Sequence, residues 1–244
     1  MKIYNIGIIG CGSIAAKMAA TLGGMKGVKR YAVASRTVEK AKAFAEKWQF
    51  AKAYGSYEEL ASDAEVDLIY IATPHAMHYD NARLCIEKGK PVLCEKAFTA
   101  NARQATDLLK LAEEKKVFLT EAIWTRYMPL SLKIRELLED GVIGTPHILS
   151  ANLGYVIDRK ERILRPELAG APCSTWVCIC STLLPCISER KWLPCILSVR
   201  KRIREWMHRK ILHCCLRMAR WLPCRQAFMP QPTAWVSFRE IRVI

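Results

Sequence analysis

The chain has 244 residues, of which 51% are hydrophobic, so it can bury one large core or two modest ones and is not a disordered protein. Its apolar runs are far shorter than the roughly 20 residues that cross a bilayer, and its start lacks the basic, apolar and small-residue order of a secretory signal. We therefore expect a soluble, cytoplasmic protein with no membrane span.

The net charge of +15 is distributed unevenly along the chain. Residues 1–172 carry 25 Lys and Arg against 20 Asp and Glu, with three cysteines, whereas residues 173–244 carry 13 against three, with eight cysteines. Residues 173–244 also contain no Gly, Asp, Asn or Tyr, although such residues build turns and helix caps in ordinary domains. The composition therefore indicates that two different kinds of sequence meet near Pro172.

An apolar run near the start of the chain leads directly into a glycine-rich loop and then into a helix-forming stretch, Ser13 to Leu22. The spacing Gly10-x-Gly12-x-x-Ala15 suits the loop that receives a dinucleotide pyrophosphate, where the first glycine makes a tight turn and the second admits a phosphate. An ordinary turn is the alternative, but the order of strand, loop and helix favours the cofactor loop. We assign Ser13 and Ile14, at the start of this helix, to the cofactor site as well.

The second predicted strand, Val28 to Ser35, precedes a helix from Thr37 to Trp48 and completes a βαβ unit. A carboxylate at the end of this strand would bind the ribose 2′-hydroxyl of NAD. Ser35 and Arg36 stand there instead, and a guanidinium beside a hydroxyl suits the 2′-phosphate of NADP. A solvated arginine is the alternative, and NAD stays possible as the cofactor.

Strands and helices continue to alternate along the chain. Ser56 to Glu59 forms a capping box that opens a short helix, and Val66 to Ala72 is a continuous apolar strand. The remaining predicted elements alternate in the same way: helix His75–Glu87, strand Pro91–Cys94, helix Asn101–Lys116 and strand Val117–Thr120. Such alternation predicts an α/β fold with a doubly wound parallel sheet of the Rossmann type.

Ligands of such sheets bind at the carboxyl ends of the strands, and the residues there are rich in polar chemistry. We assign a further group of these residues to the cofactor site: Thr73, Pro74, His75, His78, Glu95, Lys96, Trp124 and Arg126. Lys96 could also stabilise a developing alkoxide or orient a hydroxyl, while a solvated pair with Glu95 is the alternative. The two histidines are either cofactor contacts or ordinary surface residues. Cys11, Cys85 and Cys94 have no metal-ligand spacing, so we expect small buried thiols and no metal.

Four segments carry a family resemblance over about residues 1–170: GIIGCGSIA, VASR, IATPHAMHYDNARLCIEKGKPVLCEKAFTAN and TEAIWTRYMP. Together they resemble the glucose-fructose oxidoreductase / inositol dehydrogenase (Gfo/Idh/MocA) family, in particular its dihydrodiol dehydrogenase branch. The resemblance implies an NAD(P)-dependent oxidoreductase acting on a sugar, cyclitol or diol, with Lys96 as the catalytic lysine. Ala97 stands where many members have proline.

The resemblance also implies an order of domains. Residues 1–122 would be the NAD(P)-binding Rossmann domain, and residues 123–171 would begin a substrate and oligomerisation domain that is incomplete. We therefore expect a small-molecule substrate and no nucleic-acid partner, and we do not expect the homo-oligomer of the family. The family's Asp-x-Gly-x-Tyr or His element, which would supply the acid/base partner, is missing, so we expect impaired activity.

Residues 172–244 form an atypical tail that we interpret as an out-of-frame translation of a family member. When the codons are read from their third bases, Trp176 followed by Val177 forces a glycine, and Cys178 followed by Ile179 forces Tyr or His. The shifted frame permits Asp-Leu-Gly-Val-Tyr in this segment. It also permits Asn-Gly-Lys-Met-Ala-Ala from Arg217 to Leu222, a plausible hairpin.

The alternative takes the tail as a genuine protein segment. Apolar residues recur at helical spacing from Ile196 to Trp221 with Arg and Lys between them, which predicts a basic amphipathic helix. The chain would then be a non-catalytic NADP-binding protein whose helix binds a membrane surface or an acidic partner. The shifted-frame hypothesis predicts family residues that this alternative does not, and we prefer it for that reason.

Overall fold

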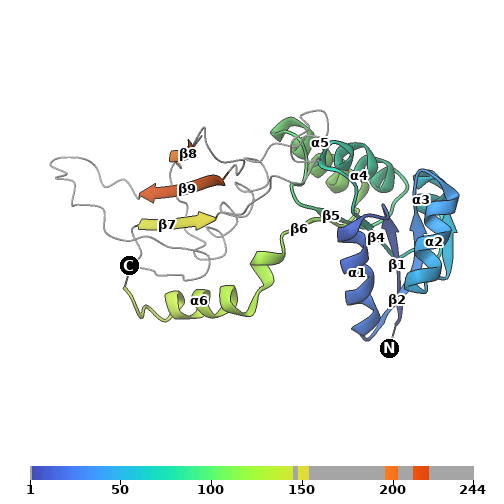
Figure 1. Cartoon of the computed structure of the whole chain (residues 1–244), viewed down its shortest axis with the longest axis horizontal. Helices are drawn as coiled ribbons and strands as arrows, with labels where there is room; N and C mark the ends of the chain where they lie inside the picture. The colour runs from blue at the N-terminus through green and yellow to red at the C-terminus, as the bar shows by residue number, and fades with distance from the viewer. Residues whose placement is uncertain (1, 145–147, 154–195, 203–210, 220–244) are drawn as a thin grey trace. The chain divides into compact units, whose positions relative to one another are not determined.

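The computed structural model describes residues 2–144, 148–153, 196–202 and 211–219 (Figure 1). Within these ranges the chain forms two compact units. The first ends at Ala122, and the second begins at Ile123.

The first unit is built on a parallel sheet of six strands. Their order across the sheet is β3-β2-β1-β4-β5-β6. Strands β2 and β3 extend the sheet on one side of β1, and β4, β5 and β6 extend it on the other, so the strand order reverses between β1 and β4. All pairs of neighbouring strands are parallel: β1 (Tyr4–Ile9), β2 (Val28–Ala34), β3 (Lys52–Tyr54), β4 (Leu68–Ile71), β5 (Val92–Glu95) and β6 (Leu119–Ala122). The predicted doubly wound Rossmann sheet is therefore confirmed.

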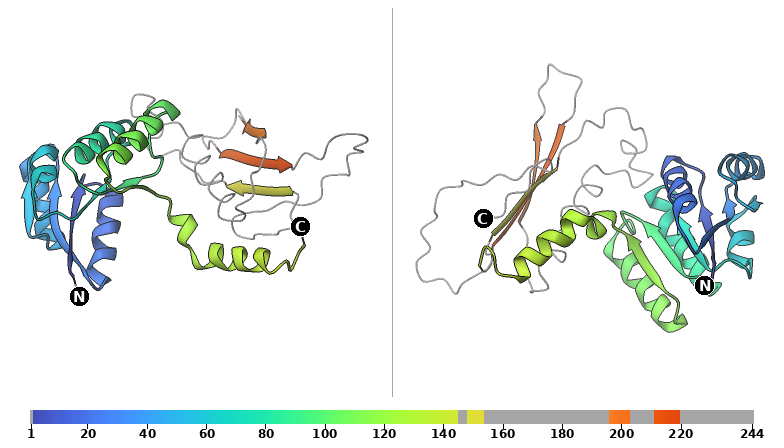
Figure 2. Two further views of the ribbon diagram at one scale, coloured as in Figure 1. Left: turned by 180° about the vertical axis from the view of Figure 1, so that it is seen from behind. Right: turned by 90° about the horizontal axis from the view of Figure 1, so that it is seen from below.

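Helices cover both faces of this sheet (Figures 1 and 2). One face packs against α1 (Ser13–Gly24) and α2 (Val38–Trp48), in a cluster that includes Ile8 and Val33. The opposite face packs against three helices: α3 (Tyr57–Ser62), α4 (His78–Glu87) and α5 (Ala102–Lys115). The single-turn helix η1 (His75–Met77) leads into α4. Burial on both faces explains why the strands are continuous apolar runs rather than alternating ones.

The starts of the helices agree with the sequence predictions in part. Ser56 accepts a hydrogen bond from the Glu59 backbone N–H at 3.2 Å, but the Glu59 carboxylate accepts from Gly55 rather than from Ser56. The predicted reciprocal capping box is therefore only half formed, because the backbone N–H preceding the N-cap takes the second bond. Thr37 occupies the N-cap of α2 without a side-chain capping bond. Strand β3 has only three residues, too few to show a period, and the sequence did not predict it.

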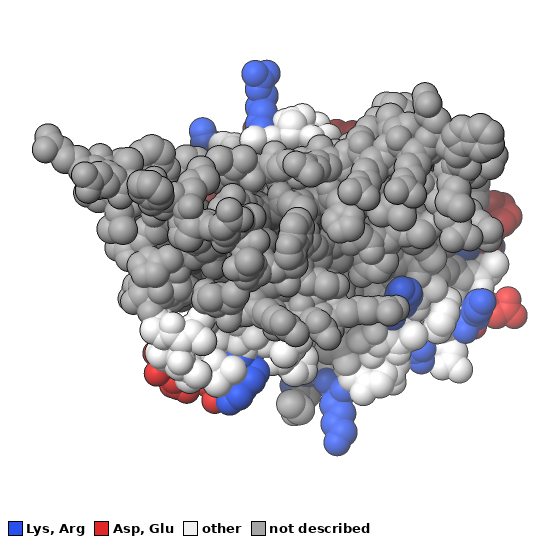
Figure 3. Space-filling view, turned by 60° about the vertical axis from the view of Figure 1, so that its left-hand side comes forward, with Lys and Arg blue, Asp and Glu red and all other residues white. Residues whose placement is uncertain are grey.

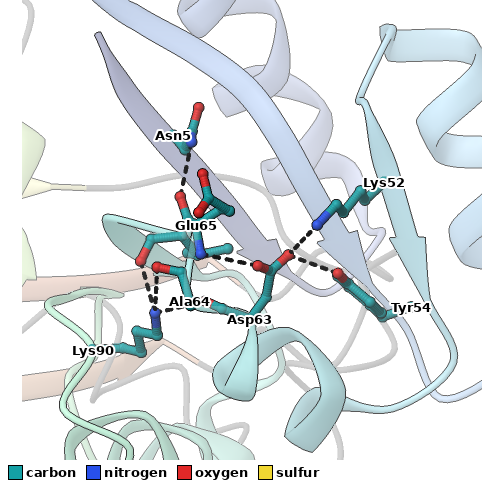
Figure 4. A network of polar contacts seen from close by, with 8 residues as sticks. Asn5, Lys52, Tyr54, Asp63, Ala64, Glu65 and Lys90 are labelled. Atoms are coloured by element: carbon teal, nitrogen blue, oxygen red, sulfur yellow. Dashed lines mark hydrogen bonds and ion pairs between the residues drawn. The ribbon is translucent and has the colours of Figure 1, made fainter. Parts of the chain in front are cut away.

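A polar network fixes the end of α3 against the sheet (Figure 4). The Asp63 carboxylate accepts hydrogen bonds from Lys52 at 2.9 Å and from the Tyr54 hydroxyl at 2.6 Å. Burial opposes ionisation of Asp63, but these bonds lower its pKa below the ordinary value. The Lys90 ammonium donates at 2.6–3.4 Å to three backbone carbonyls, those of Asp63, Ala64 and Val66. The ammonium thus satisfies carbonyls that follow the helix.

The second unit contains a helical segment and antiparallel strands. The helical segment comprises η2 (Trp124–Tyr127) and α6 (Pro129–Glu139). The strands are β7 (Ile148–Leu153), β8 (Ile196–Arg202) and β9 (Ile211–Ala219), in the order β7-β9-β8.

The strands β8 and β9 correct one prediction. The amphipathic helix expected from Ile196 to Trp221 is wrong for residues 196–202 and 211–219, which pair as antiparallel strands. Ile, Val, Leu and Cys are compatible with either structure, and ladder pairing on both sides of β9 satisfies its backbone without a helix. The residues between these strands lie outside the described ranges, as does the predicted shifted motif at residues 172–184.

No helix in the described ranges is long and apolar enough to cross a membrane. Figure 3 shows Lys and Arg side chains alongside Asp and Glu side chains on the described part of one face. Charges of both signs therefore share this surface.

Candidate functional site

The glycine loop follows β1 at the centre of the sheet. Gly10 has a φ of +104°, and a Cβ atom there would lie 2.9 Å from the carbonyl oxygen of Ala72. Its backbone N–H donates to the carbonyl of Ala34 at 2.9 Å. The turn is thus confined between the ends of β2 and β4, and only glycine fits it.

Gly12 has the opposite environment. It is the N-cap of α1, and a Cβ atom there would meet nothing within 4 Å. No described side chain caps this end of α1, and its first turn contains no acidic residue. The exposed residues Ser13 and Ile14 begin the helix. Backbone N–H groups at such a terminus, together with the helix dipole, favour an anion.

The end of β2 places Arg36 near the glycine loop. Ser35 is buried and bonds to β3 through its backbone, whereas Arg36 is exposed. Burial raises the pKa of the Tyr57 hydroxyl, and the Arg36 charge opposes this increase. Burial likewise raises the pKa of the Cys11 thiol, against the Ser35 hydrogen bond and the Lys40 charge. The charges of Arg36 and Lys40 thus act on groups beside the loop, Arg36 on Tyr57 and Lys40 on Cys11.

The sequence analysis did not identify Tyr57 and Lys40 as residues of this region. Lys40 lies in the first turn of α2 and Tyr57 begins α3. Their positions at the starts of the helices that follow β2 and β3 were the available signal, since both helices begin at the carboxyl edge of the sheet.

Two buried histidines follow β4. The rings of His75 and His78 lie 5.5 Å apart, and neither residue is more than 5% exposed, so the surface interpretation is excluded. His78 Nδ1 lies 2.8 Å from the carbonyl oxygen of Ala97, and Nε2 lies 2.9 Å from that of Thr73. Asn81 donates to the Thr73 hydroxyl at 3.0 Å. His78 therefore connects the loop after β4 with the loop after β5.

Lys96 lies in the loop that follows β5, and neighbouring groups hold this loop in place. The Glu121 carboxylate accepts a hydrogen bond from the Phe98 backbone N–H at 2.8 Å. The Lys96–Ala97 peptide bond is cis. Burial raises the pKa of Glu121, whereas the hydrogen bond from Phe98 and the Lys96 charge oppose this increase. The loop thus contacts both α4, through His78, and β6.

Glu95 ends β5 and precedes Lys96. Its carboxylate accepts a hydrogen bond from the hydroxyl of Tyr70 in β4. The sequence analysis assigned neither Tyr70 nor Glu121 to the site. Each is a polar residue inside or at the end of an apolar strand, and that contrast was the signal that could have identified them.

The other predicted site residues have different surroundings. Pro74 is half-buried and precedes η1. Trp124 and Arg126 are exposed residues of η2, in the second unit. Across the described residues, no group of three or more His, Cys, Asp or Glu side chains could hold a metal ion.

Comparison with known proteins identifies relatives of the first unit. The profile of GFO_IDH_MocA, an oxidoreductase family with an NAD-binding Rossmann fold, matches residues 4–123. The D-xylose 1-dehydrogenase (NADP(+)) of Hypocrea jecorina is 49% identical over 130 residues, which are 49% of this chain and 33% of that protein. The trans-1,2-dihydrobenzene-1,2-diol dehydrogenase of Mus musculus is 40% identical over 166 residues, or 67% of this chain and 50% of that one. The chain spans a third to a half of the length of these relatives.

Solved structures share the fold. A 3-ketoreductase from Actinomadura kijaniata in complex with NADP is 28% identical, with a TM-score of 0.56 over 62% of this chain and 48% of that chain. A probable dehydrogenase from Thermotoga maritima is 21% identical, with a TM-score of 0.75 over 82% of this chain and 60% of its own. Over residues 4–123, its Rossmann unit, the chain is similar to the Gfo/Idh/MocA family of oxidoreductases.

Proposed function

We propose that the first unit binds NADP. The reaction that it serves is hydride transfer between the nicotinamide and a secondary alcohol of a sugar, cyclitol or diol. The observation that carries this proposal is the contrast between two glycines. Gly10 has no room for a side chain, whereas Gly12 faces open space at the N-terminus of α1. A structural turn explains the first glycine, and the second leaves the N-terminus of α1 open to the approach of a phosphate.

The residues of the loop fit a dinucleotide. The pyrophosphate would bind the N–H groups at the start of α1, where the first turn carries no opposing charge. Its position at the end of β1, beside β4, is the point at which doubly wound sheets bind such ligands. When bound, the nicotinamide supplies the hydride acceptor or donor.

The region beside β2 supports NADP over NAD. Arg36 can bind a 2′-phosphate through its planar fork, and Lys40 adds a second positive charge near the same loop. The names of the Hypocrea dehydrogenase and the Actinomadura complex both include NADP, which is consistent with this choice.

Lys96 is suited to donate hydrogen bonds to the substrate oxygen. Glu95 precedes it in the chain, and the charge of Lys96 opposes the increase in the pKa of the Glu121 carboxyl. A charged lysine can orient the hydroxyl and stabilise a developing alkoxide, but it cannot accept the hydroxyl proton.

Oxidation therefore requires a separate proton acceptor. The family resemblance implies a Tyr or His in an Asp-x-Gly-x-Tyr or His element, and this element is missing from the sequence beyond Pro172. We propose that the chain binds the cofactor but turns over slowly, as a relative whose proton acceptor was lost. A missing acid/base group lowers rates by about 10²- to 10⁴-fold.

Titration of the full chain with NADPH and NADH, followed by the fluorescence of the reduced nicotinamide, tests the binding proposal. We expect saturable binding of both, with NADPH the tighter ligand. Tighter binding of NADH would refute the role of Arg36, and no binding of either would refute the role of the loop.

A further inference from the structure

Tyr70 brings a hydroxyl to the boundary between the core and the carboxyl edge of the sheet. The residue is 2% exposed, and its ring belongs to the apolar cluster that α1 and α2 cover. Phenylalanine would fill the same space without placing a polar group in the core. The hydroxyl therefore needs a hydrogen-bond partner, and Glu95 provides it.

The strand register explains how the two residues meet. Tyr70 pairs with Leu93 in the β4–β5 ladder, so Glu95, two residues farther along β5, projects on the same face. Burial, together with the Glu95 charge, raises the pKa of Tyr70. The phenol accordingly keeps its proton at neutral pH and remains a donor. One oxygen of the Glu95 carboxylate is thus fixed by a group that does not titrate.

The position of Glu95 relates this pair to the cofactor. A dinucleotide crosses the edge of the sheet between β1 and β4, with its adenosine half beside β2. Arg36 is on that side, whereas Glu95 and Lys96 end β5 on the other. Tyr70 belongs to the cluster on the face of the sheet that α1 covers, and the strand register puts Glu95 on the same face. Helix α1 is the helix that begins at the glycine loop. Glu95 therefore lies on the nicotinamide side of the site.

We infer that Tyr70 is a positioning residue for the nicotinamide half of the dinucleotide. Its hydroxyl holds the Glu95 carboxylate in one orientation, with the second oxygen available to accept from the carboxamide N–H or a ribose hydroxyl. An oriented acceptor binds such donors better than one that must first be ordered. The inference rests on the proposed function, because it takes the glycine loop as the phosphate site.

The variant Tyr70→Phe tests this inference in the full chain, with two ligands. NADPH spans both halves of the site, whereas 2′,5′-ADP carries only the adenosine half. We expect Tyr70→Phe to weaken NADPH binding by about 3- to 10-fold, the effect of one hydrogen bond, and to leave 2′,5′-ADP within about twofold. Tyr79→Phe is the matched control, because it also removes a tyrosine–carboxylate hydrogen bond, here to Asp107 on the exposed surface. It should change neither affinity.

A second variant separates positioning from general damage to the fold. Glu95→Gln should also weaken NADPH selectively, and combining it with Tyr70→Phe should add little, since both act through one contact. Equal weakening of both ligands by Tyr70→Phe, unchanged NADPH affinity, or additive effects in the double variant would each overturn the inference while leaving the proposed function intact. Failure of the unmodified chain to bind either ligand would overturn both.

Discussion

The Glu121 carboxylate accepts a hydrogen bond of 2.8 Å from the backbone N–H of Phe98, two residues beyond Lys96. This contact joins β6 to the loop after β5. Together with the contact between His78 and Ala97 at 2.8 Å, it holds the loop from two different elements. The position of the candidate catalytic lysine is therefore set by residues that are not themselves expected to touch a substrate.

Two substitutions of Glu121 should have different effects on stability. Glu121→Gln keeps an oxygen that can accept from Phe98 and removes a half-buried charge, so we expect the free energy of unfolding to change by less than about 0.5 kcal/mol at neutral pH. Glu121→Ala removes the acceptor and should cost about 1–3 kcal/mol. Urea unfolding measures both. Equal losses in the two variants would show that the hydrogen bond is not the stabilising feature.

The same carboxyl should also make stability depend on pH. Burial raises the pKa of Glu121 above its ordinary 4.5, so between these two values the folded state binds more protons than the unfolded state. Its contribution to stability should therefore decline as the pH rises from about 4.5 through the raised pKa. Glu121→Gln should flatten this part of the profile. If stability depended on pH with the same slope in the variant and in the parent chain, Glu121 would not be the group responsible.

His78 should respond to pH in the opposite direction. Its burial lowers the pKa below the ordinary 6.5, against the hydrogen bonds to Thr73 and Ala97. The unfolded state then binds more protons below pH 6.5, so stability should be lost as the pH falls from 6.5 toward the lowered value. An NMR titration of the imidazole, assigned with His78→Gln, measures the pKa directly. A midpoint above 6.5 would show that the two carbonyls outweigh burial and hold an imidazolium.

The cofactor preference should depend on Arg36 and less on Lys40. Arg36→Ala should weaken NADPH binding by about 10- to 100-fold, the effect of losing hydrogen bonds between charged groups, and leave NADH nearly unchanged. Lys40→Ala should show the same selectivity with a smaller loss. The control is Lys47→Ala, in the last turn of the same helix. Parallel losses of NADPH and NADH affinity would argue against recognition of the 2′-phosphate.

Much of the first unit could be predicted from the sequence because its signals are local. The apolar run before Gly10 and the glycine spacing identified the central strand and loop, and alternation of strands and helices identified the sheet. The contacts around Lys96 were not predictable in this way. Tyr70 and Glu95 are 25 residues apart, and Phe98 and Glu121 are 23 apart. Periodicity shows which face a side chain occupies, but not which residue of the next strand it meets.

In the second unit, the local sequence pattern predicted the wrong secondary structure. Apolar residues from Ile196 to Trp221 fit a helical period, yet residues 196–202 and 211–219 form strands. Short apolar runs are compatible with both structures, and their strand pairing depends on partners that are distant in the sequence. β9 pairs with β7, more than 50 residues earlier in the chain, and no local pattern indicates such a partner.

The shifted-frame hypothesis for residues beyond about 169 makes a prediction about individual codons. We expect the Ser174 codon to end in G, which gives Asp in the shifted frame, and the Cys178 codon to end in T, which gives Tyr. Sequencing the coding DNA determines both bases. Any other base at the third position of the Ser174 codon would remove the Asp of the family element from the shifted frame, and this result would contradict the hypothesis.

Restoring the frame near Ala169 should recover dehydrogenase activity. A proton acceptor contributes about 10²- to 10⁴-fold in rate, so we expect a gain of that size with a diol or sugar and NADP. The NADPH affinity should hardly change, because the residues assigned to its phosphates lie before Gly55. Equal rates in the original and restored chains would contradict both the account of the tail and the need for this residue.

The most direct test of the central claim is NADPH binding by the full chain with an aspartate at either end of α1. A side chain at Gly12 or at Gly24 meets nothing within 4 Å, so Gly12→Asp and Gly24→Asp should both fold. Gly12→Asp places a negative charge where the phosphates are proposed to bind and should weaken NADPH at least about 100-fold, whereas Gly24→Asp should leave affinity within about twofold. Equal NADPH affinity in the two variants would contradict the assignment of the glycine loop.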